Sequence, residues 1–238
     1  MTVTVTAALM LVLRQYFGKA QDWRIFLLDE SANNWKTQLA DALYQDTESG
    51  LYPLLFWAAG CVLFYLLLPA IVSAFVLKTP LKQSGFNFQV PPQHWKIYRF
   101  LLLIVLPFVY IASFSVHFRE TYPFYRVTAE TYDPGLFVLW EIAYFLQFVS
   151  VEYFFRGFLL FHSEKYIGKH GVLLSMLPYC MIHFGKPFPE TVGAIIAGIV
   201  LGTMALKSRS IIPGILLHYI VAIAMDLLSL SARLHPVD

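Results

Sequence analysis

The stretch PLLFWAAGCVLFYLLLPAIVSAFVL, residues 53–77, contains no charged residue and is the clearest indication of the fold. The hydrocarbon core of a bilayer is about 30 Å thick, and a helix needs roughly 20 apolar residues to cross it. Residues 53–77 are long enough for one crossing, and a polar loop that begins with Lys78 follows them. The sequence therefore predicts a membrane-spanning helix in this stretch.

Further apolar runs follow along the chain, at residues 100–118, 135–161, 172–184, 191–206 and 211–230. The run at 135–161 would reach about 40 Å as a helix, so we expect it to tilt, kink or protrude. In the run at 191–206, Gly198 and Gly202 lie one turn apart, which favours close packing against another helix. The runs predict an all-α fold, a polytopic helical membrane protein with about six to eight transmembrane helices.

Residues 1–50 are mixed in character and form the most acidic part of the chain. We interpret them as an N-terminal amphipathic or interfacial segment, with residues 23–28 and 35–44 along the membrane surface, and a solvated arm is the alternative. Thr2 to Leu13 lack a preceding charged region and a small-residue cleavage site, so they are expected to form a membrane-contacting helix. Residues 51–238 are the membrane domain.

The composition favours a lipid environment. Hydrophobic residues make up 58% of the 238 residues and charged residues 13%, whereas soluble domains carry about 25% charged residues. The net charge is only +2, and no basic run exceeds two adjacent charges, which excludes nucleic acid as a partner. Cys61 and Cys180 lie in apolar stretches and are predicted to be buried thiols. The lipid bilayer is the expected partner of these surfaces.

Ionisable residues interrupt the later apolar runs. In lipid such residues are expensive unless they are paired or line a wet cavity. Glu152 and Arg156 are four residues apart, which places both side chains on one helical face where they can form an ion pair. A buried pair that only fixes helix packing is the alternative.

Two histidines join this group. His218 is flanked by apolar residues and needs a polar partner from another helix. Asp226 shares its face of the helix, about 12 Å further along. His183 ends an apolar run, where a histidine at the interface or hydrogen-bonded in the core is the alternative. Lys186 and Glu190 follow in the next turn, at the expected mouth of a pocket, unless they are ordinary loop charges.

Together these side chains can converge from different spans in one polar pocket. They supply a general base, its orienting partner and donors for an oxyanion, which are the groups needed to activate a water molecule. A carboxylate and two histidines, Glu152, His183 and His218, would equally suit a divalent metal such as zinc. The residues leave both mechanisms open.

The order of Glu152-x-x-x-Arg156-Gly157, Tyr179-x-x-x-His183 and Gly214-x-x-x-His218 resembles the CPBP (Abi) family of intramembrane proteases. That family includes the CAAX-prenyl endopeptidases and bacterial proteins linked to bacteriocin processing or self-immunity. The resemblance covers a core at about residues 135–232. It implies a CPBP-type intramembrane (metallo)endopeptidase that cleaves a membrane-associated protein or peptide, in the plasma membrane of a prokaryote.

The resemblance also implies roles for individual residues. Glu152 would activate the attacking water, with Arg156 as its charge partner. His183 and His218 would bind that water or a metal. Asp226 is a secondary candidate for the catalytic site.

Three positions depart from the family pattern. Val151 stands where the family has the first of two glutamates, Tyr179 replaces a phenylalanine, and Ala222 stands where Asn or Asp would follow His218. Two hypotheses result: hydrolysis by Glu152 with help from Asp226, or a catalytically inactive immunity or scaffold protein that binds a membrane partner. A transporter would show broken helices in symmetric halves, and the sequence contains no internal repeat.

Overall fold

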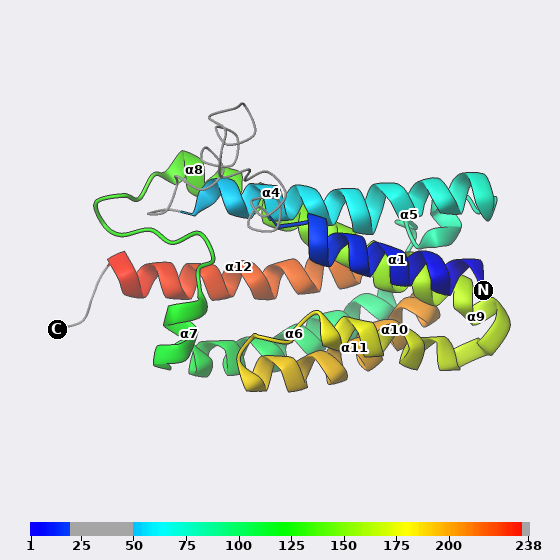
Figure 1. The fold of residues 1–238 in the computed structure, drawn as a ribbon. Coiled ribbons are helices and arrows are strands. Elements are labelled where there is room, and N and C mark those ends of the chain that lie inside the picture. The colour runs from blue at the N-terminus through cyan, green and yellow to red at the C-terminus, as the bar shows by residue number, and fades with distance from the viewer. Residues whose placement is uncertain (20–49, 235–238) are drawn as a thin grey trace, which may run out of the picture.

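The protein is a bundle of long helices. The computed structural model describes residues 1–19 and 50–234, and within these ranges every regular element is helical. The long helices run side by side along a common direction, with α12 (Ile212–Leu234, red) at the centre of the bundle (Figure 1). The predicted all-α polytopic fold is confirmed.

Among the described residues, five helical runs are long and apolar enough to cross a membrane. They are Leu51–Val76, Pro92–Ala112, Pro134–Met181, Phe188–Ser208 and Ile212–Leu234. The first run is one rod built from α4 (Leu51–Cys61), η1 (Val62–Leu67), α5 (Leu68–Ile71) and η2 (Val72–Val76). It corresponds to the span predicted at residues 53–77.

The run Pro134–Met181 contains two legs. It comprises α8 (Pro134–Glu152), η4 (Tyr153–Leu160), α9 (Phe161–Ile167), η5 (Gly168–His170) and α10 (Gly171–Met181). The chain leaves helical geometry at Gly168, whose φ is 58°, and α10 then packs back against η4. Ser175 joins the legs by donating a 2.7 Å hydrogen bond to the carbonyl oxygen of Phe155. The runs predicted at 135–161 and 172–184 are these two legs.

Local chemistry sets the helix ends. Asp133 caps α8 by accepting hydrogen bonds from the backbone N–H groups of Gly135 and Leu136, at 2.7 and 3.0 Å. α6 (Pro92–Ala112) begins at a proline, well before the predicted residue 100, because its polar first turns are helical too. The predicted end at residue 118 is wrong, because Ser115 caps a separate short helix, α7 (Val116–Thr121).

Small residues bring α11 (Phe188–Ser208) close to α10, as predicted. A Cβ atom added at Gly198 would lie 2.7 Å from Cγ of Met176, and one at Gly202 would lie 3.1 Å from Cγ1 of Val172. These distances are shorter than normal contacts between side chains. The close approach of α10 and α11 fixes the leg that carries His183 at its end.

The outer faces of the bundle are apolar. On α6, Phe100, Leu103 and Phe108 are each more than 60% exposed, which suits contact with lipid tails. α1 (Thr2–Phe17) packs on the bundle through Val3, Ala7 and Met10 and exposes Val5, Leu9 and Val12. The segments predicted to be amphipathic, 23–28 and 35–44, lie outside the described residues. Cys61 is buried as predicted, whereas Cys180 is half-buried.

Candidate active site

Glu152 and Arg156 lie where α8 passes into the π-helical stretch η4. The Nη1 atom of Arg156 is 3.2 Å from Oε1 of Glu152, and each side chain is only 1% exposed. The ion pair predicted from the four-residue spacing is therefore present and buried. π-Helical segments often occur at functional sites, and this one sets the position of Arg156 relative to the carboxylate.

His218 reaches the same carboxylate from α12. Its Nδ1 is 3.1 Å from Oε1 of Glu152. Because a carboxylate can only accept, Nδ1 carries the hydrogen and donates it. Its Nε2 lies 3.2 Å from the hydroxyl oxygen of Tyr179, and a neutral Nε2 accepts the tyrosine hydrogen. The prediction that His218 needs a partner from another helix is confirmed.

Gly214 leaves space beside the second carboxylate oxygen. A Cβ atom at this position would stand 3.0 Å from Oε2 of Glu152. Within residues 1–19 and 50–234, no hydrogen bond uses Oε2, while Oε1 faces both Arg156 and His218. The carboxylate is thus held through one oxygen and keeps the other available.

His183 lies in the turn after α10 and is 9% exposed. Its Nδ1 is 2.8 Å from the carbonyl oxygen of Tyr179. The carbonyl can only accept, so Nδ1 carries the hydrogen and the neutral ring keeps a lone pair on Nε2. Burial, together with the nearby charge of Lys186, lowers the pKa of His183 to about 4. The ring is therefore neutral at physiological pH.

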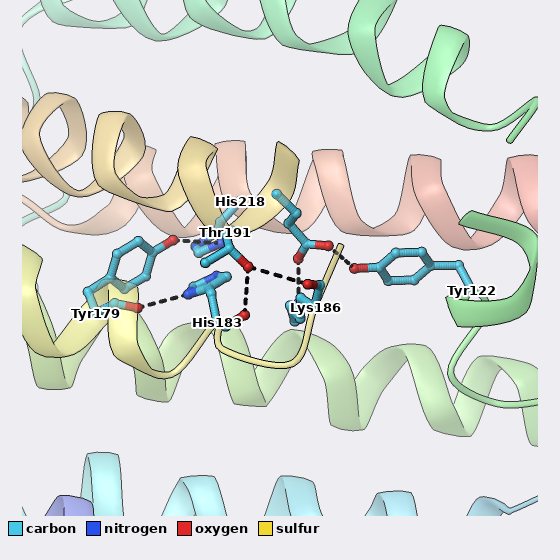
Figure 2. A network of polar contacts seen from close by, with 7 residues as sticks. Tyr122, Tyr179, His183, Lys186, Thr191 and His218 are labelled. Carbon is cyan, nitrogen blue, oxygen red and sulfur yellow. Dashed lines mark hydrogen bonds and ion pairs between the residues drawn. The ribbon is translucent and has the colours of Figure 1, made fainter. Parts of the chain in front are cut away.

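Tyr179 lies beside both histidines and joins His183 and His218 by hydrogen bonds (Figure 2). The guanidinium carbon of Arg156 is 4.0 Å from the centre of its ring, and the His183 and His218 ring centres are 4.7 and 6.1 Å away. The sequence indicates Tyr179 only as a replacement of phenylalanine, whereas the structure shows its hydroxyl against Nε2 of His218. Tyr179 carries a polar hydroxyl at a position where the family pattern is apolar, and this difference was the signal that could have identified it as a site residue.

A polar network supports the turn that carries His183 (Figure 2). Thr191 donates a 2.9 Å hydrogen bond to the carbonyl oxygen of His183. Lys186 pairs with Glu190 at 2.6 Å, and the Tyr122 hydroxyl donates to the other oxygen of Glu190 at 2.6 Å. Lys186 and Glu190, which the sequence left as either mouth residues or loop charges, are thus part of this support.

Asp226 lies in a second buried cluster, away from Glu152. Trp140 donates its indole N–H to Oδ2 of Asp226 at 3.1 Å, and the hydroxyl of Tyr219 lies 3.3 Å from Oε2 of Glu141. Asp226 is fully buried and Glu141 is 6% exposed, and this cluster is separate from the one around Glu152. The structure therefore brings together Glu152, Arg156, His183 and His218 around Tyr179, without Asp226.

The metal alternative can be tested against the donor set. In the described part of the chain, no three His, Cys, Asp or Glu side chains form a group that could hold a metal ion. Glu152, His183 and His218 are not such a group in this arrangement, in which Nδ1 of His218 faces Glu152 and Nδ1 of His183 faces the carbonyl oxygen of Tyr179.

The two apolar departures from the family pattern occupy packed positions. Val151 is 5% exposed and belongs to the apolar cluster around Phe154 and Phe155. Ala222 is also 5% exposed and belongs to the cluster that contains Trp140 and Phe148.

The comparison with protein families agrees with this geometry. Residues 133–224 match the family described as type II CAAX prenyl endopeptidase Rce1-like. No curated protein and no solved structure matches the chain. With its five helical runs that are long and apolar enough to cross a membrane, the chain is an integral membrane protein. The match over residues 133–224 confirms the resemblance found over residues 135–232.

Proposed function

We propose that this protein is an intramembrane endopeptidase that hydrolyses a peptide bond of a membrane-associated protein or peptide. The observation that carries the proposal is the buried Glu152 carboxylate, which binds Arg156 and His218 through Oε1 and keeps Oε2 beside Gly214. A general base needs a lone pair that structural partners do not occupy. Oε2 meets this requirement.

In the proposed reaction, Oε2 of Glu152 takes a proton from a water molecule. The water oxygen attacks the carbonyl carbon of the scissile peptide bond, and the carbonyl oxygen becomes an oxyanion. Glu152 then delivers its proton to the amide nitrogen, the carbon–nitrogen bond breaks, and a carboxylic acid and an amine are released. The charge of Arg156 compensates the carboxylate before it takes the proton and again after it has delivered the proton to the amide nitrogen.

The two histidines have different proposed roles. His218 orients the carboxylate through Nδ1–H. His183 presents the lone pair of Nε2, because its own hydrogen is committed to the Tyr179 carbonyl. A neutral His183 can accept a hydrogen bond from the attacking water and hold it near the substrate. The pKa of about 4 keeps it in this form over the physiological range.

The substrate class that we propose is a lipid-anchored protein or peptide, because the matching family is described by its action on CAAX prenyl sequences. We further propose that the protein acts in the plasma membrane of a prokaryote, in line with the bacterial members of the CPBP family. Expression in a bacterium followed by separation of inner and outer membranes tests this location.

The central experiment compares cleavage by the wild-type protein and by Glu152→Gln in liposomes. The probe is a fluorescence-quenched peptide with a farnesylated CAAX end. We expect cleavage by the wild type and a loss of at least about 100-fold in Glu152→Gln, since general bases contribute about 10²–10⁴-fold. The matched control is Glu130→Gln, which changes an exposed loop glutamate. Full activity in Glu152→Gln, or no cleavage by the wild type, would contradict the proposal.

A zinc requirement is a separate proposal that the resemblance suggests. Metal analysis of the purified protein and an assay with a chelator test it. If a chelator abolishes cleavage and added zinc restores it, the water mechanism given above is replaced by a metal-assisted one. If the rate is unchanged, the mechanism with protein groups alone is supported.

The second candidate is an immunity or scaffold protein without catalysis. Val151 and Ala222 favour it, because both are apolar where the family pattern has polar residues. This candidate predicts that His183→Ala and His218→Ala leave partner binding and the cellular phenotype unchanged. The endopeptidase predicts that both variants lose cleavage.

A further inference from the structure

We propose that Tyr179 is a positioning residue whose hydroxyl fixes the ring of His218 against Glu152. The inference rests on the proposed endopeptidase function and deepens it. The hydroxyl of Tyr179 is 3.2 Å from Nε2 of His218. It supplies the polar contact on the Nε2 side of His218.

In the neutral imidazole ring, one tautomer of His218 satisfies both hydrogen bonds. The carboxylate of Glu152 accepts from Nδ1, and the hydroxyl of Tyr179 donates to Nε2. In the opposite tautomer, Nδ1 would present a lone pair to a carboxylate at 3.1 Å, and Nε2–H would compete with the tyrosine hydrogen. The hydroxyl and the carboxylate thus hold the imidazole from both ends.

Tyr179 itself has little freedom to move. Its side chain is only 1% exposed. The guanidinium carbon of Arg156 lies 4.0 Å from the centre of its ring, and the ring of Phe155 makes an edge contact with it at a centre-to-centre distance of 5.4 Å. Because the ring is fixed by these contacts, the hydroxyl has a fixed direction. A donor with a fixed direction restricts the orientation of the ring that accepts its hydrogen bond.

The residue orients both histidines through different groups. Its backbone carbonyl accepts from Nδ1 of His183, and its side-chain hydroxyl donates to His218. Only the second contact depends on the residue being tyrosine. Replacement by phenylalanine therefore removes the His218 contact and leaves the ring under Arg156 and the His183 contact in place.

Position 222 explains why such a contact matters in this chain. Ala222 lies one turn beyond His218 on α12 and provides no polar group. Without the tyrosine hydroxyl, Nε2 of His218 would have no hydrogen-bond partner within the residues that the structure describes. The ring would then be held from one end only, and the orientation of Glu152 would loosen with it.

The test is Tyr179→Phe in the full-length protein, assayed with the farnesylated CAAX peptide. We expect kcat to fall about tenfold with KM unchanged, since the lost contact acts on the base and not on the substrate; tenfold corresponds to about 1.4 kcal/mol. The matched control is Tyr65→Phe, a buried tyrosine of the apolar core, which should leave kcat unchanged. An unchanged kcat in Tyr179→Phe would overturn the proposal.

A spectroscopic readout makes the test independent of catalysis. Nitrogen-15 NMR of histidine-labelled protein in micelles reports which ring nitrogen carries the hydrogen, and His218→Gln assigns the resonances. In the wild type, Nδ1 of His218 should be protonated and Nε2 hydrogen-bonded. In Tyr179→Phe, the Nε2 resonance should move toward that of a free imidazole nitrogen, with His183 unaffected.

The two proposals can fail separately. If Glu152→Gln retains full cleavage, the proposed function is wrong, and the NMR result still decides whether the hydroxyl positions His218. If the wild-type spectrum has the hydrogen of His218 on Nε2, the positioning role is wrong even though the endopeptidase stands. The wild-type spectrum also decides the matter if Tyr179→Phe does not fold.

Discussion

Arg156→Gln should destabilise the protein strongly, because it removes the positive partner of a buried carboxylate. Both side chains of the Glu152–Arg156 pair are 1% exposed, and the charged atoms are 3.2 Å apart. With an effective dielectric constant of about 20, the Coulomb attraction at this distance is about 5 kcal/mol. Removing one member of a buried pair typically costs about 3–5 kcal/mol. We expect a decrease of this size in the free energy of unfolding.

The double variant Glu152→Gln/Arg156→Gln should recover most of this loss. It contains no unpaired charge, and the amide oxygen at position 152 can still accept from Nδ1 of His218. We therefore expect its free energy of unfolding to lie within about 1.5 kcal/mol of the wild type, since a neutral pair of similar volume is often nearly as stable.

Reversible unfolding in mixed micelles, followed by circular dichroism as the fraction of denaturing detergent rises, measures these differences. The control is Arg209→Gln, which breaks an ion pair with Glu164 in which Arg209 is 62% exposed; such pairs contribute about 0–1 kcal/mol. If Arg156→Gln costs less than about 1 kcal/mol, or if the two single losses simply add in the double variant, the buried pair is not coupled as the geometry requires.

Three further changes probe the surroundings of the pair. Gly214→Ala should lower kcat of the peptide assay at least about tenfold, because the new Cβ would meet Oε2 of Glu152 at 3.0 Å; unchanged kcat would show that this oxygen is not the base. Between pH 6.5 and about 4, His183 is protonated in the unfolded chain but neutral in the folded protein. The free energy of unfolding should therefore fall by up to about 3 kcal/mol as the pH is lowered through this window. Melting curves of His183→Gln should lack this part of the pH dependence. Asp226→Asn should keep an acceptor for the indole N–H of Trp140 and unfold within about 1 kcal/mol of the wild type, whereas Asp226→Ala leaves that buried N–H unpaired and should lose about 1–3 kcal/mol; equal losses in detergent unfolding would rule out a role for this hydrogen bond.

The sequence predicts the membrane spans well because each span depends only on the length and hydrophobicity of its own stretch of residues. An uncharged stretch of sufficient length has no stable environment except lipid or a buried core, so residues 53–77 were predictable without knowledge of any contact. The ends of the helices were less predictable. α6 begins at Pro92 and includes polar residues in its first turns, because a helix can continue into the interface where water and lipid headgroups satisfy polar side chains.

The site was predictable in part for the same reason. The Glu152–Arg156 pair depends on helical spacing alone, and it is present. Distances along one helix were also predictable, since Asp226 does lie two turns beyond His218 on α12. Which helix faces Asp226 was not predictable, because Trp140 is 86 positions away in the chain. The same limit applies to Tyr179 and His218, which are 39 positions apart and meet only when α10 and α12 are packed.

The energetics of the cluster favour hydrolysis over a purely structural role. Buried ion pairs are weak stabilisers compared with apolar residues of similar volume. The Nε, Nη1 and Nη2 atoms of Arg156 have no hydrogen-bond acceptor of good geometry among the described residues, although such buried donors are normally satisfied. Val151 and Ala222, in contrast, are well packed. A chain that needed this region only for packing or partner binding would be more stable with apolar residues at 152 and 156 as well. A charged pair with unused donors around a carboxylate that keeps one free oxygen is instead the arrangement that a developing negative charge requires.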